Sequence, residues 1–348
     1  MDHRPRLLIT LGDVAGIGPE VVAKAWVDLL DICGPVVVGD VDWLRRATKF
    51  APQRLDVVSI NEVNRTPYAP HIIPCLQATT TNLAGVETGA VHALAGRAAY
   101  DFLCAAIDAT RAGQADGIVT MPLNKEGLHA AGLFYPGHTE ILAERTGVKD
   151  FGMMLYAPAT PERPHAIGVV HVTLHMRLRE VFDHITTEAV LEKIRLLDRV
   201  MAKLRDGPHP RPLSQRERGE MPRLVVAALN PHASDGGIFG DEEARIIAPA
   251  VARARREGVN VVGPLPCDTL FVQAAKGKFD GVVAMVHDQG HIALKLLTGL
   301  AAVNVTLGLP IVRTSVAHGT AYDIAGKGVA DPQSLLEAAR VAAALARL

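Results

Sequence analysis

The sequence predicts an α/β protein with largely parallel sheets. Short, continuously apolar runs alternate with longer amphipathic segments along the chain, and this alternation is typical of strands joined by right-handed helical crossovers. Hydrophobic residues make up 49% of the 348 positions, which is enough for a sizeable buried core and excludes a disordered or fibrous protein. A chain of this length folds as one large or two ordinary domains.

The expected strands are runs that stay apolar from end to end, as in strands covered by helices on both faces. They are residues 6–11, 35–39, 117–121, 166–172, 223–229, 259–263, 281–286 and 302–306. The expected helices are residues 19–30, 87–111, 187–205, 241–257 and 333–348. Pro19 suits a first helical turn, and the acidic residues Asp241, Glu242 and Glu243 complement a helix dipole.

Residues 206–221 interrupt this pattern. They are rich in proline, arginine and polar residues and show no periodicity. We expect a polar surface insertion between a helix and the next strand, with a basic docking loop as the alternative.

Charge and cysteine content narrow the class of function. The 36 Lys and Arg residues nearly balance the 37 Asp and Glu residues, which argues against a nucleic-acid binder that relies on non-specific phosphate attraction. The cysteines are scattered without a C-x-x-C pair, as expected for thiols in a reducing compartment. No apolar run reaches the length of a signal-peptide core or a membrane span. We expect a cytoplasmic protein without a membrane partner.

The glycine-rich stretch 12–20 resembles a dinucleotide-binding fingerprint without completing it. It follows a strand and opens a helix, and Asp40 ends the next strand where a ribose-binding acid would lie. However, Val21 occupies the third glycine position, and Pro19 removes a backbone donor that a pyrophosphate would need. We therefore expect a tight strand-to-helix turn that lines a site, and not a standard Rossmann fold.

Three histidines form a candidate metal site. His175, His232 and His287 each follow an apolar strand, and the carboxyl ends of strands in an open α/β sheet converge on the ligand crevice. Three imidazoles with open positions suit Zn²⁺, with Co²⁺ or Mn²⁺ as alternatives. The other interpretation is that these histidines cap strands or bind substrate directly. His138 lies in a similar polar context.

A second group of polar residues follows. Lys295, Asn304 and Arg313, with Thr314 and Ser315 beside the arginine, lie near strand ends. Buried cations are costly unless paired, so this set predicts a clamp for an anionic ligand such as a phosphate. The alternative is an internal salt bridge to Asp288 or Asp323.

Six motifs in order carry a family resemblance. They are GDVAGIGPE at 12–20, GHTE at 137–140, LNPHASDGG at 229–237, GPLPCDTLF at 263–271, HDQG at 287–290 and VNVTLGLPIVRTSVAHGTAYDIAGKGVAD at 303–331. With them the chain resembles the 4-hydroxythreonine-4-phosphate dehydrogenase family of vitamin B6 biosynthesis over nearly its whole length. The resemblance implies oxidation and decarboxylation of a phosphorylated hydroxy acid, with NAD or NADP and a divalent metal (Zn²⁺, Co²⁺, Mn²⁺ or Mg²⁺).

The resemblance also implies an architecture. It indicates two α/β/α domains similar to those of isocitrate and isopropylmalate dehydrogenases, with the active site in the cleft between them. Residues 1–135 rejoined by 305–348 would form one domain, and 136–304 the other. The resemblance further implies a homodimer in which the partner subunit completes the active site.

Roles carry over by position. His175, His232 and His287 would be the metal ligands. His138 and Thr139 would contact the substrate, and Lys295, Asn304 and Arg313 would hold it, chiefly at the phosphate. The general base is not identified by the sequence; Asp268 and Lys125 are candidates. The nicotinamide pocket is not located either, beyond the glycine-rich stretches near Gly236 and Gly308.

Some positions depart from the biosynthetic pattern. Val14 replaces a proline, the segment 171–180 reads HVTLHMRLRE, and His291 follows HDQG where leucine is usual. These changes resemble a branch that oxidises D-threonate or D-erythronate 4-phosphate. A branch that oxidises an aromatic cis-diol dicarboxylate is similar in the histidine run but lacks the Lys, Asn and Arg set. Two other classes remain as alternatives, a metal-dependent phosphohydrolase and a non-catalytic phosphosugar sensor.

Overall fold

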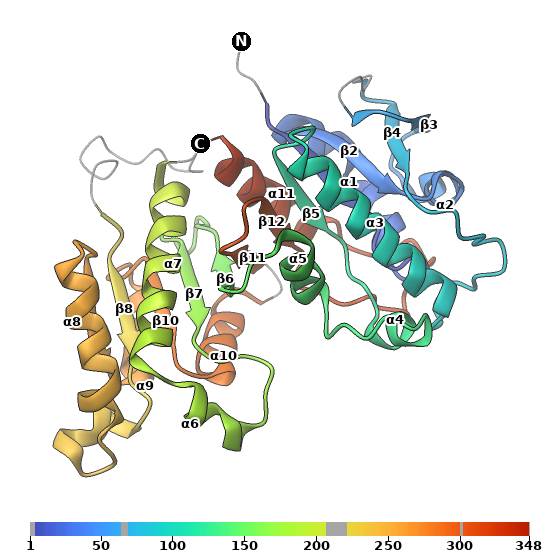
Figure 1. The fold of residues 1–348 in the computed structure, drawn as a ribbon. Coiled ribbons are helices and arrows are strands. Elements are labelled where there is room, and N and C mark those ends of the chain that lie inside the picture. The colour runs from blue at the N-terminus through green and yellow to red at the C-terminus, as the bar shows by residue number, and fades with distance from the viewer. Residues whose placement is uncertain (1–3, 64–68, 207–220, 300–301, 348) are drawn as a thin grey trace. The chain divides into compact units, whose positions relative to one another are not determined.

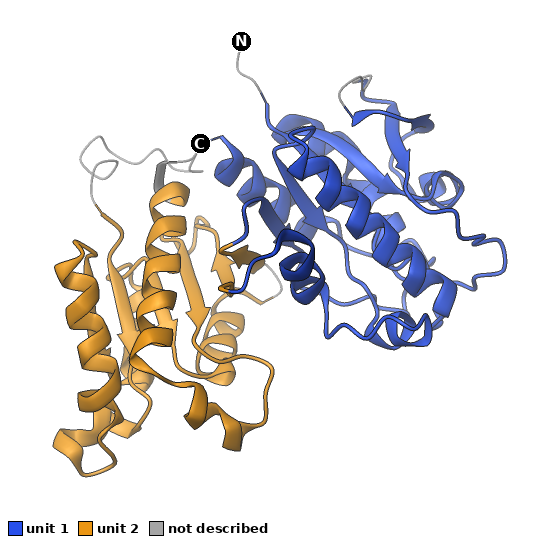
Figure 2. Ribbon diagram, viewed as in Figure 1, with its two compact units in different colours: residues 1–149, 309–348 blue, residues 150–308 orange. Residues whose placement is uncertain are grey.

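The computed structural model describes residues 4–63, 69–206, 221–299 and 302–347 (Figure 1). Its contacts divide the chain into two compact units (Figure 2). Unit 1 consists of Met1–Lys149 and Leu309–Leu348, and unit 2 of Asp150–Gly308. The division into folding domains expected from the sequence stays a prediction. The expected insertion at 206–221 lies almost entirely outside the described residues.

Unit 1 is built on a parallel sheet with the strand order β3–β4–β2–β1–β5–β12 (Figure 1). The strands are β1 (Arg6–Thr10), β2 (Gly34–Gly39), β3 (Asp56–Ile60), β4 (Ile72–Gln77), β5 (Gly117–Thr120) and β12 (Val312–Ser315). The helices are α1 (Gly18–Ile32), α2 (Val41–Ala47), α3 (Ala93–Arg111), α4 (Lys125–Ala130), α5 (His138–Thr146) and α11 (Gln333–Ala346), with a 3₁₀ turn η1 (Thr48–Phe50). Helix α3 packs on β1, β2 and β5, whereas α11 packs on β5 and β12 and against α1.

The glycine-rich stretch forms the tight turn predicted from the sequence. A Cβ atom at Gly18 would collide with the carbonyl oxygen of Leu11, and one at Gly16 would lie 2.7 Å from the carbonyl oxygen of Thr320. The glycines are therefore needed for close backbone packing. Asp40 is a helix cap, because its side chain accepts a hydrogen bond from the backbone N–H of Trp43 at 2.9 Å at the start of α2.

Unit 2 contains a mixed sheet with the order β11–β6–β7–β10–β8–β9. Its strands are β6 (Gly152–Ala157), β7 (Ile167–His171), β8 (Leu224–Ala227), β9 (Val261–Leu265), β10 (Gly281–Ala284) and β11 (Val303–Leu307). Strand β6 runs antiparallel to β7 and β11, and the pairs β7–β10, β10–β8 and β8–β9 are parallel. The expected α/β class with largely parallel sheets is confirmed.

Helices cover this sheet on both faces. They are α6 (Val181–His184), α7 (Thr187–Asp206), α8 (Ala248–Arg256), α9 (Cys267–Ala275) and α10 (His287–Thr298), with 3₁₀ turns η3 (Leu178–Glu180) and η5 (Pro231–Gly237) and a π-helical turn η6 (Glu243–Ile247). Successive residues of β7 point to opposite faces: Val169 packs with Leu270 of α9 and Leu294 of α10, whereas Gly168 faces Leu197 and Met201 of α7.

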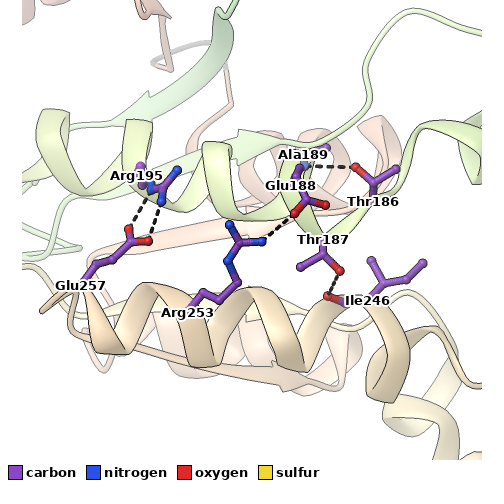
Figure 3. A network of polar contacts seen from close by, with 8 residues as sticks. All are labelled: Thr186, Thr187, Glu188, Ala189, Arg195, Ile246, Arg253 and Glu257. Atoms are coloured by element: carbon purple, nitrogen blue, oxygen red, sulfur yellow. Dashed lines mark hydrogen bonds and ion pairs between the residues drawn. The ribbon is translucent and has the colours of Figure 1, made fainter.

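Polar contacts tie α7 to α8 and to the π-helical turn η6 that precedes α8 (Figure 3). Arg195 pairs with Glu257, with Nε 2.7 Å from Oε2, and Arg253 pairs with Glu188 at 2.6 Å. The hydroxyl of Thr187 donates to the carbonyl oxygen of Ile246 at 3.1 Å. These contacts fix η6 and α8 against the first half of α7. None of the helices in the described ranges has both the length and the apolar character needed to cross a bilayer.

Candidate active site

Three loops that carry histidines leave neighbouring strands of unit 2. In the sheet, β10 lies between β7 and β8, and Val283 pairs with Val170 on one side and with Val226 on the other. His175 follows β7, His232 follows β8, and His287 is the first residue of α10 after β10. Because the three strands are parallel, all three loops lie at their carboxyl ends, which is where ligands bind in α/β sheets.

Backbone and side-chain bonds tie the three loops together. The N–H and the hydroxyl of Thr173 donate to the carbonyl oxygen of Met285, at 3.1 and 2.8 Å. The amide of Gln289 donates to the carbonyl oxygen of Ala228 at 3.1 Å, and its Oε1 accepts from the N–H of Met285 at 2.9 Å. Thr173 thus joins the His175 loop to the end of β10. Gln289 joins the end of β10 to the His232 loop.

Four imidazoles cluster beside α10. The rings of His175 and His287 have centroids 5.6 Å apart, and His291 stacks on His287 with centroids 3.7 Å apart. His291 Nδ1 lies 3.1 Å from His171 Nε2. His171 and His291 are both buried. Their burial lowers the pKa of His171 to about 3 and that of His291 to about 4, and the neighbouring imidazoles reinforce the effect. The pair is therefore neutral at physiological pH.

The chemistry of this set fits a divalent cation that prefers nitrogen ligands. His175 is exposed, and the ring of His287 is one-third exposed. His287 Nδ1 lies 2.8 Å from Asp288 Oδ1, which is the usual outer partner of a metal-binding imidazole and leaves Nε2 available. The side chains are not arranged as a finished site, since no three His, Cys, Asp or Glu residues in the described ranges converge in ligand geometry.

The His232 loop has an unusual backbone. Residues 232–236 all have positive φ, from 44 to 70°, and the first four of them are not glycine. Left-handed conformations cost about 1–3 kcal/mol for a non-glycine residue and are concentrated at functional sites. His232 itself is exposed, so the strained backbone presents its imidazole outward.

The other predicted residues of unit 2 lie on α9, α10 and β11. Lys295 is exposed and forms no ion pair with a described residue. Asn304 donates weakly to the sulfur of Met153 at 3.3 Å, and its Oδ1 is buried without a hydrogen bond to any described group. Such an orphaned acceptor invites a donor from a ligand. Asp268 is exposed in the first turn of α9, where its Oδ1 accepts from the N–H of Thr269 at 2.9 Å.

Unit 1 holds the remaining predicted residues. Arg313 on β12 is 2% exposed and donates to the hydroxyl of Thr120 at 2.7 Å. Burial lowers its pKa to about 10, against the opposing influence of the Glu140 carboxylate. His138 begins α5, with Thr139 next to it. Burial and the nearby Arg313 guanidinium keep the pKa of His138 well below its usual value, so its imidazole is neutral. Lys125 is exposed at the start of α4.

A pair in unit 1, between the buried Asp13 and the half-buried Tyr322, was not singled out from the sequence. The hydroxyl of Tyr322 donates to Asp13 Oδ2 at 2.7 Å, and the N–H of Ala15 donates to Oδ1 at 2.9 Å. Asp13 is 1% exposed, and burial raises its pKa although these bonds oppose the rise. The pair joins the first and the last of the six motifs. The signal in the sequence is a charged residue in the glycine-rich turn that follows an apolar strand.

Comparison with known proteins identifies the family. Residues 31–342 match the family described as pyridoxal phosphate biosynthetic protein PdxA. A 4-hydroxythreonine-4-phosphate dehydrogenase from Geobacter metallireducens is 42% identical over 99% of this chain and 96% of its own length. A D-threonate 4-phosphate dehydrogenase from Cupriavidus necator is 43% identical over 99% of this chain and 98% of its own.

A solved structure of the same family is also similar to this chain. The crystal structure of 4-hydroxythreonine-4-phosphate dehydrogenase from Klebsiella pneumoniae is similar with a TM-score of 0.83 and 40% identity, covering 98% of this chain and 99% of that one. The resemblance found from the six motifs is thereby confirmed. This chain belongs to the PdxA family of pyridoxal phosphate biosynthetic proteins.

Proposed function

We propose that this chain oxidises and decarboxylates a phosphorylated hydroxy acid of the 4-phosphooxy-L-threonine type, with NAD or NADP as hydride acceptor and a divalent cation as cofactor. Membership of the family and the dehydrogenase names of its relatives support the reaction class. The observation that carries the proposal is the joining of the His175, His232 and His287 loops at the ends of three neighbouring parallel strands.

In this proposal the three histidines hold the cation, which is Zn²⁺, Co²⁺, Mn²⁺ or Mg²⁺. A divalent cation, when bound, supplies Lewis acidity that lowers the pKa of a substrate hydroxyl. Asp288 orients the ring of His287 through Nδ1. The neutral His171–His291 pair packs behind that ring without adding positive charge beside the cation.

The clamp residues bind the charged substrate. Arg313 supports this role because a guanidinium that is 2% exposed is suited to a strong charge-assisted bond with a phosphate. Lys295 adds a second charge and Asn304 an amide, and His138 and Thr139 are further residues that contact the substrate in this proposal. Asp268 and Lys125 are the candidates for the base that would take the hydroxyl proton. A nicotinamide cofactor, when bound, would accept the hydride, and the resulting keto acid would lose carbon dioxide.

A second candidate is oxidation of D-threonate or D-erythronate 4-phosphate. The Cupriavidus necator relative, named for the first of these compounds, is as similar to this chain as the relative named for the B6 intermediate. The buried His291, which replaces a usual leucine, favours this branch.

The deciding experiment compares NADH and NADPH formation from 4-phosphooxy-L-threonine, D-threonate 4-phosphate and D-erythronate 4-phosphate, with and without a chelator. Chelator-sensitive turnover of one compound assigns the substrate. Release of inorganic phosphate without reduced cofactor would replace the proposal with a phosphohydrolase, and binding without turnover would replace it with a sensor.

Matched variants test the histidines. His175→Ala should abolish turnover and lower metal content, because it removes an exposed imidazole at the loop cluster. His71→Ala removes an exposed imidazole from unit 1 and should leave both turnover and metal content unchanged. Equal metal content in the two variants would argue against His175 as a ligand.

We also propose that the chain works as a homodimer in the cytoplasm. Helix α10 exposes Ile292 and Leu296, which are one helical turn apart and 55% and 83% exposed. In this proposal the apolar face that they form is part of the interface between the two copies. The four cysteines are free thiols, as expected in a reducing compartment. Light scattering should give twice the chain mass, and Leu296→Glu should shift it toward the monomer.

A further inference from the structure

The side chain of Glu243 lies directly under the loop that carries His232. Its carboxylate is 5% exposed. Oε1 accepts hydrogen bonds from the N–H groups of Leu229 and Asn230, at 2.8 and 2.7 Å. Oε2 accepts from the side-chain amide of Asn230 at 3.0 Å and from the hydroxyl of Ser234. The donors flank His232 on both sides in the chain.

This carboxylate is charged although no cation pairs with it in the described part of the chain. Burial raises its pKa, but the bonds from Asn230 and Ser234 outweigh burial and hold the pKa below its ordinary value. Apart from the backbone N–H of Glu243 itself, every donor that stabilises the charge belongs to residues 229–234. The charge therefore depends mainly on this loop keeping its conformation.

The loop depends on Glu243 in return. Four consecutive non-glycine residues with positive φ, 232 to 235, do not hold such a backbone by local preference. Ser234 is 4% exposed and is fixed by its bond to the carboxylate. The loop has further contacts. The Asn230 amide also donates to Glu242 at 2.8 Å, and the N–H of Phe239 donates to the carbonyl oxygen of Ser234 at 3.2 Å.

A rigid support places the carboxylate. Glu243 begins the π-helical turn η6, and such a turn re-aims the side chains of a helix. Ile247 at the other end of this turn is fully buried. The Thr187 hydroxyl holds the carbonyl oxygen of Ile246 in the same turn, beside the ion pairs that join α7 and α8 (Figure 3).

We propose that Glu243 is a positioning residue that sets the place of His232 and thereby the affinity of the site for a divalent cation. The inference rests on the proposed function, in which His232 is a metal ligand. Glu243 acts only through the loop, because its four bonds end on groups on either side of His232. Outer partners of metal ligands typically change metal affinity 10- to 100-fold when they are removed.

The test is a titration of the metal-stripped protein with Co²⁺, followed by its visible absorption spectrum. Glu243→Gln keeps the shape of the side chain and one acceptor but turns an amide N–H₂ toward the donors of Asn230 and Ser234. We expect the Kd for Co²⁺ to rise about tenfold or more and the spectrum to change. Glu242→Gln is the matched control: it removes only the second bond to the Asn230 amide and should change the Kd less than threefold.

A double-mutant cycle shows whether the effect passes through His232. His232→Ala should itself weaken Co²⁺ binding, and Glu243→Gln should then add nothing to that loss. An unchanged Kd in Glu243→Gln alone, or an equal rise in both backgrounds, would overturn the positioning role. An unchanged Kd in His232→Ala would instead show that the proposed ligand set is wrong, and the inference would fail with it.

A milder variant tests the same proposal if Glu243→Gln fails to fold. If Glu243→Gln does not fold, Ser234→Ala removes a single donor from the carboxylate and leaves the others in place. A rise of threefold or more in the Kd for Co²⁺, with the melting temperature within a few degrees of the wild type, supports the proposal. No rise in a folded Ser234→Ala protein contradicts it.

Discussion

Replacing Tyr322 with phenylalanine tests its hydrogen bond to the buried Asp13 and should give a stability loss that depends on pH. Burial raises the pKa of Asp13, so the folded chain binds this proton more tightly than the unfolded chain. The contribution of Asp13 to stability is therefore largest at low pH and declines as the pH rises through its raised folded value. The Tyr322 hydroxyl, 2.7 Å from Oδ2, offsets part of this decline.

The magnitude follows from the charge on the acceptor. A hydrogen bond to a charged group contributes about 1.5–3 kcal/mol, and one between neutral groups about 0.5–1.5 kcal/mol. Tyr322→Phe should therefore lower the free energy of unfolding of unit 1 by about 1.5–3 kcal/mol at pH 7.5 and by about half as much at pH 4. Each kcal/mol corresponds to a shift of about 2–4 °C in Tm for a unit of this size.

Calorimetry at the two pH values is the measurement. Tyr135→Phe is the control, because Tyr135 donates to Glu144 at 3.0 Å on the surface, where such a bond contributes little. The reasoning would be refuted if Tyr322→Phe lowered Tm equally at both pH values, or if Tyr135→Phe lowered it as much.

Three further predictions concern the candidate site. Arg313→Ala should raise KM for the phosphorylated substrate by about 10- to 100-fold, because a buried charge-assisted contact is lost; equal kcat/KM on the unphosphorylated acid in the unaltered protein would contradict this role. His291→Leu leaves His171 without its imidazole partner and should lower stability by about 1–3 kcal/mol, measured by denaturant unfolding; an unchanged midpoint would show that the pair contributes nothing. Removal of metal with a chelator should abolish NADH formation, and added Co²⁺ should restore it, whereas activity that persists without metal would exclude a catalytic cation.

The sequence predicted the parts of the fold that depend on local patterns. Apolar runs identified central strands such as β1, β5 and β10, whose residues are buried on both faces. Strands β3, β4, β6 and β12 were outside that list; β3 is half exposed, and β12 contains Arg313 and Thr314. The antiparallel direction of β6 could not have been predicted from an apolar run either, since strand direction is set by the connections and not by composition.

In the candidate site, too, some residues could be predicted from local patterns and others depend on the fold. His175, His232 and His287 could be proposed because each follows a strand, and a position after a strand has a known place in a parallel sheet. The pairing of His171 with His291 could not be predicted from the sequence, because it joins the end of β7 to the first turns of α10 across a long stretch of chain. Glu243 looked like an ordinary acidic residue in a first helical turn, and only the fold turns its carboxylate toward residues 229–234.

The ties that Thr173 and Gln289 make between loops have a consequence for how this family diversifies. An insertion or deletion in one loop would displace the ends of the others, because each tie ends on a backbone carbonyl of a neighbouring strand end. Exchange of a side chain that these loops present leaves the ties in place. Relatives named for two different substrates each cover 99% of this chain, at 42% and 43% identity.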